Sequence, residues 1–429
     1  RLNSQIHIFS EKKSNRLVYI LSEVFERRLQ LTPVLYRDAN EYSEVAGLKI
    51  NYSNLDLPGL QIKPAVLLFE RRIDDHDLST FMERGILKLF KSSSVLGYDP
   101  LAAAFYFLSR YEEYLPHRED EHGRYKAEES VVVQNQCHQL PLVEIYCEEL
   151  RHELGLEKSL PSIETELITV DVDQVFAFKA KGLARTIAGT LKSLLKSTNS
   201  FSKRLSVLIG QDSDPLDIYD DLIEDFQNTG TSSIFFFQVG EASSHDINNP
   251  PHLSLVKQRI NDVAMKARIG LHPSYHTPQS HEMLQLEVER LKAITSIPVT
   301  QSRQHYLKFK IPETFKWLKE AGVEKEYSMA YSTINGFRAS TCKPFEFFDL
   351  RADDRIEMEM MPTCWMDMTA VRNHIRVEDA MAELLELRKT VHTYGGHFIT
   401  TWHPDSLIGM NVEYSTLPLL HQLIGKDEI

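Results

Sequence analysis

Cysteine is scarce in this sequence of 429 residues, which contains only Cys137, Cys147, Cys342 and Cys364. No two of these cysteines form a CxxC pair. Disulfide frameworks and cysteine-rich zinc sites both leave characteristic cysteine spacings in a sequence. The sequence therefore indicates neither of these features.

Long apolar runs and an excess of positive charge are also lacking. The longest apolar run, Leu101 to Leu108, is far shorter than the roughly 20 residues of a membrane-spanning helix. The chain has 48 Lys and Arg residues against 61 Asp and Glu residues, a net charge of −13. The short apolar run predicts no membrane span. Because nucleic acids and membrane surfaces attract clustered positive charge, the negative net charge predicts no nucleic-acid partner.

Three further absences concern targeting and chemistry. The N-terminal stretch RLNSQIHIFSEKK has no apolar segment resembling a signal peptide, so we expect a cytoplasmic protein. The sequence has no Gly-x-Ser-x-Gly elbow, which argues against a serine nucleophile. It also has no glycine-rich phosphate loop, which argues against NAD and ATP chemistry.

The sequence does contain two segments with different patterns. The first mixes helices with short strand-like runs, Gln5 to Phe9, Pro33 to Tyr36 and Ala65 to Phe69. Asp99 and Pro100 are suited to begin one of its helices, and a second is predicted from Leu142 to Glu153. Gly and Pro residues interrupt the pattern in LGLEKSLPSIETE. We therefore predict a small α/β domain of unknown role, residues 1–160, followed by a second domain, residues 161–429.

The second segment alternates strand-like runs with amphipathic helices. The predicted strands are Leu167 to Val170, Ile234 to Gln238, Ile269 to Leu271, Pro298 to Thr300, Glu326 to Met329, Ile356 to Met360 and His397 to Thr401. Pro215 and Pro278 are predicted in first helical turns, and Gly230 and Gly395 at helix ends. The alternation predicts a parallel barrel or an open α/β sheet. In both architectures the functional groups gather where the strands end.

Two of the predicted strands end in residues suited to bind a metal. Asp171 and Asp173 follow the first strand, and His272 and His276 follow the third. Each pair could instead be structural, the aspartates as turn or cap residues and the histidines as solvated or core side chains. Two imidazoles and a carboxylate form a set that suits a divalent cation, leaving Asp171 as a candidate general base.

Two other strand ends carry further polar candidates. Arg303, His305 and Tyr306 follow the fourth strand, and a cationic Arg303 near Asp171 would keep that carboxylate ionised. His403 follows the last strand as a candidate proton donor, which Asp367 could orient. The alternatives are a surface ion pair for Arg303 and simple packing beside Trp402 for His403.

The segments DVD, HPSYH, SRQHY and TWHP, in this order at strand ends, resemble the successive motifs of NodB-homology polysaccharide deacetylases, carbohydrate esterase family four. The resemblance covers residues 161–429 and implies a distorted (β/α)7 barrel that binds a divalent metal, usually zinc. The first 160 residues resemble a small domain of unknown role found ahead of some bacterial members.

The resemblance also implies roles for individual residues. The catalytic residues would be Asp171 as base, Arg303 as its orienting partner and His403 as acid, with Asp367 beside it. The metal ligands would be Asp173, His272 and His276. Apart from the resemblance, the candidate substrate-binding residues near the predicted site are Tyr275, His305, Tyr306, Arg338 and Trp402, with core packing as the alternative for each aromatic side chain. The implied reaction is hydrolysis of acetyl groups on N-acetylated sugars or a polysaccharide intermediate.

The sequence departs from the family pattern at several positions. A valine separates Asp171 from Asp173, where the family has adjacent aspartates. His305 stands where the third motif has proline, and Gly336 to Phe345 matches the fourth motif only loosely. These departures concern the groove around the metal, so two alternatives stay open. One is a related barrel that hydrolyses cyclic imides or small amides, and the other is a non-catalytic glycan-binding protein. Nothing in the sequence specifies an oligomeric state.

Overall fold

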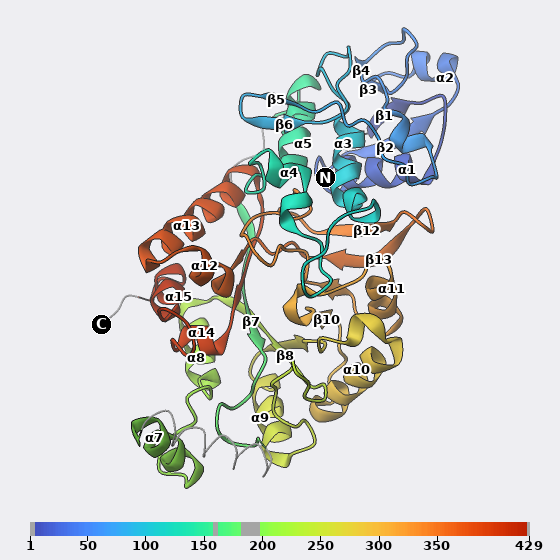
Figure 1. Ribbon diagram of the computed structural model, residues 1–429. Coiled ribbons are helices and arrows are strands. Elements are labelled where there is room, and N and C mark those ends of the chain that lie inside the picture. The colour runs from blue at the N-terminus through green and yellow to red at the C-terminus, as the bar shows by residue number, and fades with distance from the viewer. Residues whose placement is uncertain (1–4, 158–161, 182–197, 427–429) are drawn as a thin grey trace. The chain divides into compact units, whose positions relative to one another are not determined.

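The computed structural model describes residues 5–157, 162–181 and 198–426 (Figure 1). The predicted boundary near residue 160 lies outside these ranges. The chain forms two compact units, and neither is continuous in sequence. The first unit contains Arg1–Glu164, Met329–Cys364 and Leu387–Phe398. The second contains Thr165–Ser328, Trp365–Glu386 and Ile399–Ile429.

The first unit contains a small parallel sheet in the order β2-β1-β3-β4. Its strands are β1 (Gln5–Phe9), β2 (Thr32–Tyr36), β3 (Leu48–Asn51) and β4 (Leu60–Gln61). Helices α1 (Asn15–Leu21) and α2 (Ala39–Glu44) connect the parallel strands. The first two predicted strands are confirmed. The third predicted strand, Ala65 to Phe69, was wrong. Val66–Phe69 is a 3-10 helix, η2, which buries the adjacent residues Leu67 and Leu68, whereas a strand would bury alternate residues.

Helix α3 (Pro100–Leu108) is buried along its whole length, and α5 (Leu142–Glu153) packs against it. Asp99 begins α3 as predicted, because its side chain accepts hydrogen bonds from the backbone N–H groups of Leu101 and Ala102. The same unit contains an antiparallel hairpin of β12 (Phe345–Asp349) and β13 (Asp354–Met360). Its smaller elements are β5 (Phe81–Glu83), β6 (Ile86–Lys88), η3 (Tyr111–Tyr114), η4 (Ala127–Glu129) and α4 (Val131–Gln134).

The second unit is organised around strands in the order β11-β10-β9-β8-β7-β15-β14. Their bounds are β7 (Ile163–Val172), β8 (Ser232–Phe237), β9 (Arg268–Leu271), β10 (Gln301–Ser302), β11 (Lys325–Glu326), β14 (Trp365–Met366) and β15 (Gly396–Trp402). The pairs from β7 through β11, and the pair β14–β15, are parallel. Phe235, Phe236 and Phe237 of β8 are fully buried, as expected for a central strand.

The mixed α/β class is thus confirmed, but the described strands do not close into a barrel. No pairing among them joins β14 back to β11. Strands β10, β11 and β14 have two residues each, so they make few of the backbone hydrogen bonds that closure requires. The predicted strand at Pro298 to Thr300 begins later, at Gln301.

Helices separate the strands of the second unit. The longer ones are α7 (Thr198–Leu208), α8 (Tyr219–Thr229), α9 (Ser254–Ala264), α10 (His281–Thr295), α11 (Glu313–Glu320) and α13 (Val377–Tyr394). The shorter ones are α12 (Asp367–Asn373), α14 (Pro404–Leu407) and α15 (Leu417–Leu423). No helix in the described ranges has the length and apolar character that crossing a bilayer requires.

The predicted helix ends at Gly230 and Gly395 were confirmed, and Pro278 lies in a first helical turn as predicted, whereas the predicted helix start at Pro215 was wrong. Gly230 ends α8 in the left-handed conformation, with φ +67°. Pro215 precedes the first residue of α8, and Pro278 lies in the 3-10 helix η5 (Thr277–Gln279). Ser280 caps α10 by accepting a hydrogen bond from the backbone N–H of Met283, so the serine sets the helix start.

Replacing the buried cap residue of α3 should destabilise the first unit. Asp99 also accepts hydrogen bonds from the Tyr52 hydroxyl (2.7 Å) and the Ala65 N–H (2.8 Å). Asp99→Ala leaves these donors unpaired and should lower the free energy of unfolding by about 3 kcal/mol in urea denaturation. The control is Asp38→Ala at the exposed cap of α2, with an expected loss of about 1 kcal/mol. Equal losses would contradict this account.

Candidate metal centre

The site is built where β7, β9 and β10 end, all within the second unit. Asp171 lies near the end of β7, and Asp173 follows the strand directly. His272 follows β9. Arg303 follows β10, and His305 begins the short 3-10 helix η6 (His305–Leu307). Since these strands are parallel neighbours, their ends meet at one edge of the sheet.

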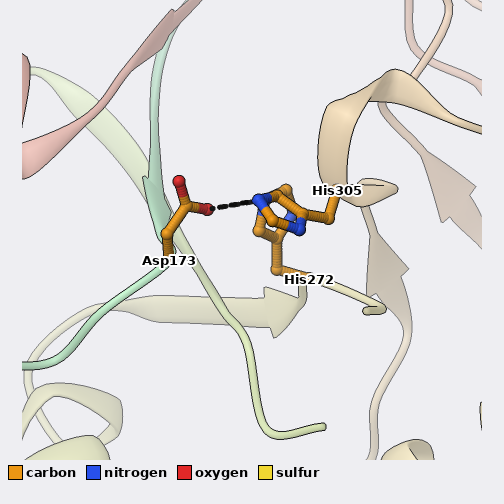
Figure 2. A group of neighbouring side chains, drawn as sticks. All are labelled: Asp173, His272 and His305. Carbon is orange, nitrogen blue, oxygen red and sulfur yellow. Dashed lines mark ion pairs between the residues drawn. The ribbon is translucent and has the colours of Figure 1, made fainter. Parts of the chain in front are cut away.

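Three of these side chains converge on one point (Figure 2). Asp173 Oδ1 lies 3.2 Å from His272 Nε2 and 3.5 Å from His305 Nε2. The three ligand atoms all lie within 4.8 Å of one another. Asp173 Oδ1 is buried, and none of the residues that the structure describes gives it a hydrogen bond. A buried carboxylate oxygen facing two imidazoles in this way is suited to bind a divalent cation.

Outer contacts fix the orientation of both imidazoles. His272 Nδ1 lies 2.6 Å from the backbone oxygen of Arg303. His305 Nδ1 lies 2.9 Å from Asp246 Oδ1. The Arg303 oxygen and the Asp246 carboxylate are acceptors, so a proton on each Nδ1 satisfies them and each Nε2 faces Asp173. Gln238 Nε2 also lies 3.0 Å from His305 Nδ1 and further fixes the ring. Metal-binding histidines in proteins are held in the same way.

The electrostatics of the three residues are consistent with a cation at this point. Burial alone would raise the pKa of Asp173, but His305 and His272 hold it well below its usual range. Burial would lower the pKa of His305, but the charge of Asp173 raises it to about 9. The Asp173 carboxylate is therefore stabilised by a positive charge beside it. A divalent cation would supply that charge in place of the proton on the His305 imidazolium.

Asp171 has a different environment from Asp173. Its side chain is buried, and its Oδ1 accepts a hydrogen bond from Arg303 Nη1 at 3.0 Å. Its Oδ2 lies 4.0 Å from His272 Nε2. Arg303 is fully buried, and its Nε donates to the backbone oxygen of Tyr327 at 3.1 Å. Asp171 is thus a fixed carboxylate beside the possible metal site.

Asp367 and His403 form a second buried pair. Asp367, the first residue of α12, is fully buried. Its Oδ1 lies 2.7 Å from His403 Nδ1, and its Oδ2 accepts a hydrogen bond from the His403 backbone N–H at 2.8 Å. Burial alone would lower the pKa of His403, but Asp367 raises it to about 10 with help from Asp173 and Asp171. The Nε2 atom of His403 can therefore carry a proton at neutral pH.

The structure places His276 outside the group of three. It immediately precedes η5, and its ring packs edge-on against Tyr275 with ring centres 5.1 Å apart. Tyr275 is itself stacked on His245 at 3.9 Å, and Lys308 Nζ lies 3.5 Å from the centre of the Tyr275 ring. Tyr306 meets Tyr275 edge-on at 5.3 Å. These aromatic side chains form one cluster beside η6.

Two predicted substrate-binding residues lie in other surroundings. Trp402 is fully buried, packs at a tilt against Trp365 with ring centres 4.8 Å apart, and donates from Nε1 to Thr400 Oγ1 at 2.8 Å. Its indole face is therefore not exposed to a sugar. Arg338 belongs to the first unit, where it donates to both carboxylate oxygens of Glu113 at 2.9 and 2.7 Å.

Sequence reasoning missed two buried carboxylates that support the site. Asp246 lies in the loop after β8, well beyond the strand end, and contacts His305. Glu287 of α10 holds the HPSYH segment through hydrogen bonds from the Ser274 N–H (2.9 Å) and the Ser274 hydroxyl. Glu287 occupies an apolar position in the helical pattern of α10, which was the signal available.

Known proteins resemble parts of the chain. Residues 6–158 match the model of a family of unknown function, DUF7033. No curated protein matches the sequence. A solved structure assigned as a polysaccharide deacetylase from Mycobacterium smegmatis is 14% identical, covers 62% of this chain and 85% of its own, and has a TM-score of 0.39.

Two other solved structures show weaker likeness. A CE4-family pseudoenzyme from Bacillus anthracis is 11% identical, covers 62% of this chain and 61% of its own, and has a TM-score of 0.32. IcaB from Ammonifex degensii is 14% identical, covers 39% of this chain and 85% of its own, and has a TM-score of 0.23. Scores this low carry no argument about function, which depends on the residues of the site.

Replacing Glu287 should change how stability depends on pH. Burial raises the pKa of Glu287 from 4.5 to about 7. The folded state then keeps a proton that the unfolded chain has lost, so stability falls as the pH rises from about 4.5 to 7. Glu287→Gln should remove this fall and gain up to about 3 kcal/mol at pH 8 by urea denaturation. Glu289→Gln, at an exposed position of the same helix, is the matched control. A loss of stability in Glu287→Gln at pH 8 would contradict the prediction.

Proposed function

We propose that the second unit is a metal-dependent hydrolase that removes acetyl groups from N-acetylated sugars or a polysaccharide intermediate. The observation that carries the proposal is the convergence of Asp173 Oδ1 with two oriented imidazole Nε2 atoms, close to the buried carboxylate of Asp171. The acetylated sugar as substrate rests on the resemblance of DVD, HPSYH, SRQHY and TWHP to deacetylase motifs.

Asp173, His272 and His305 would hold the cation, which is zinc in our proposal because imidazole and carboxylate ligands suit it. When bound, such a cation polarises an amide carbonyl and acidifies a water molecule. The other residues move protons. Asp171 accepts the proton of the attacking water, and its hydrogen bond from Arg303 keeps it oriented.

His403 acts as the acid that protonates the departing amine. Its Nδ1 is held by Asp367, so Nε2 is the atom that delivers the proton. The two aspartates that face histidines thus have separate tasks, since Asp173 would bind the cation and Asp367 keeps His403 charged.

Replacing the base should abolish turnover without removing the metal. We expect Asp171→Asn to bind about one equivalent of zinc by elemental analysis and to lose about 10²- to 10⁴-fold in acetate release from N-acetylglucosamine oligomers. Asp173→Asn is the control, because it should lose both metal and activity. Full activity in Asp171→Asn would contradict the assigned base. A metal-bound wild type that releases no acetate would contradict the proposed reaction and favour a binding protein or an imide hydrolase.

The pair of Asp367 and His403 predicts an alkaline limit to activity. His403 must be protonated to act as the acid, so kcat/KM should fall as the pH rises through its pKa. Asp367 raises that pKa to about 10, so Asp367→Asn should move the alkaline limb down by at least about one pH unit. The measurement is the pH profile of kcat/KM for acetate release. An unmoved alkaline limb would show that His403 is not the acid.

A further inference from the structure

The loop that follows β8 carries a buried carboxylate with a full set of contacts. Asp246 is 1% exposed. Its Oδ1 lies 2.9 Å from His305 Nδ1 and accepts hydrogen bonds from Gln238 Nε2 (2.7 Å) and the Tyr275 N–H (3.0 Å). Its Oδ2 accepts a hydrogen bond from the Ser243 hydroxyl at 2.7 Å. Contacts on both oxygens leave the carboxylate a single orientation.

The orientation of Asp246 determines that of His305. A carboxylate at Nδ1 favours the proton on that atom and fixes the plane of the ring. Gln238 Nε2 donates to the same carboxylate and also lies 3.0 Å from His305 Nδ1, so it holds the pair together. The opposite atom, Nε2, then points at Asp173 Oδ1, 3.5 Å away. A chain of three side chains, Asp246, His305 and Asp173, therefore runs from the β8 loop to the possible cation site.

We propose that Asp246 is a positioning residue that holds His305 as the third metal ligand, a place that the sequence motif gives to His276. This inference deepens the proposed function and rests on it, because it concerns the same cation. His305 occupies the position where related motifs have proline, which has no side-chain ligand atom. His305 therefore occurs in this protein with a carboxylate, Asp246, that orients its imidazole.

The surroundings of His276 agree with its absence from the ligand set. Its ring packs against the rings of Tyr275 and His245, with ring centres 5.1 and 6.3 Å away. The Tyr275 N–H is one of the donors to Asp246. Thus Tyr275, against which His276 packs, helps to fix Asp246, and Asp246 orients His305.

The test is the zinc affinity of the full chain, measured by competition with a chromogenic chelator. Asp246→Asn keeps the shape of the side chain but removes its charge, so we expect zinc affinity to fall about 10- to 100-fold. The matched control is Ser243→Ala, which removes the hydrogen bond to Oδ2 and those that the serine hydroxyl accepts from the His245 and Asp246 N–H groups, and leaves the Oδ1 contact with His305. It should bind zinc like the wild type, and so should His276→Ala.

A double-mutant cycle separates positioning from general structural damage. In a His305→Ala background, Asp246→Asn should cause no further loss of zinc affinity, because the residue through which it acts is gone. The absorption spectrum of bound cobalt(II) should change in Asp246→Asn and stay unchanged in Ser243→Ala. Additive losses in the cycle, equal losses in the two loop variants, or loss of zinc in His276→Ala would each overturn the inference.

These measurements need no substrate, so they separate this inference from the proposed reaction. Zinc binding that depends on Asp246 and His305 supports the inference even if no acetate is released. A zinc affinity that is unchanged in Asp246→Asn overturns the inference even if the enzyme releases acetate. A wild type that binds no zinc overturns both.

Discussion

The structure of the site depends on one negative charge, the carboxylate of Asp173, whose Oδ1 is buried although 30% of the side chain is exposed. Within the described part of the chain this oxygen accepts no hydrogen bond, and a carboxylate oxygen withdrawn from water without a counter-charge is costly. The imidazoles of His272 and His305 meet that requirement only if their Nε2 atoms face it. Their outer contacts, the Arg303 carbonyl and Asp246, are therefore part of the same electrostatic arrangement.

Arg303 gives neighbouring carboxylates different properties. Its guanidinium is a permanent cation that pairs with Asp171, whereas Asp173 faces imidazoles that can exchange a proton for a metal ion. Its backbone oxygen meanwhile holds the ring of His272. Arg303 thus orients both the Asp171 carboxylate and the His272 imidazole, and two aspartates separated by a single valine have different surroundings.

Much of the sheet and part of the site could be predicted from sequence. Apolar runs such as Ile234 to Phe237 become buried strands, and the strand-end rule pointed to Asp173 and His272, two of the three side chains that the structure brings together. The group of three also includes His305, whose place depends on the backbone of η6, where Tyr306 has φ +61°. A local residue pattern does not specify such a turn. Asp246 was missed because a long loop, rather than a strand end, brings it to the site.

The cation site is assembled from residues far apart in the chain, at positions 173, 272 and 305. Parallel strands pair only after long crossover connections are complete, so such contacts form late in folding. The ligand set consequently exists only once β7, β9 and β10 lie in one sheet. A cation bound there would act on the native state by slowing its unfolding, and would have little part in guiding the chain to that state.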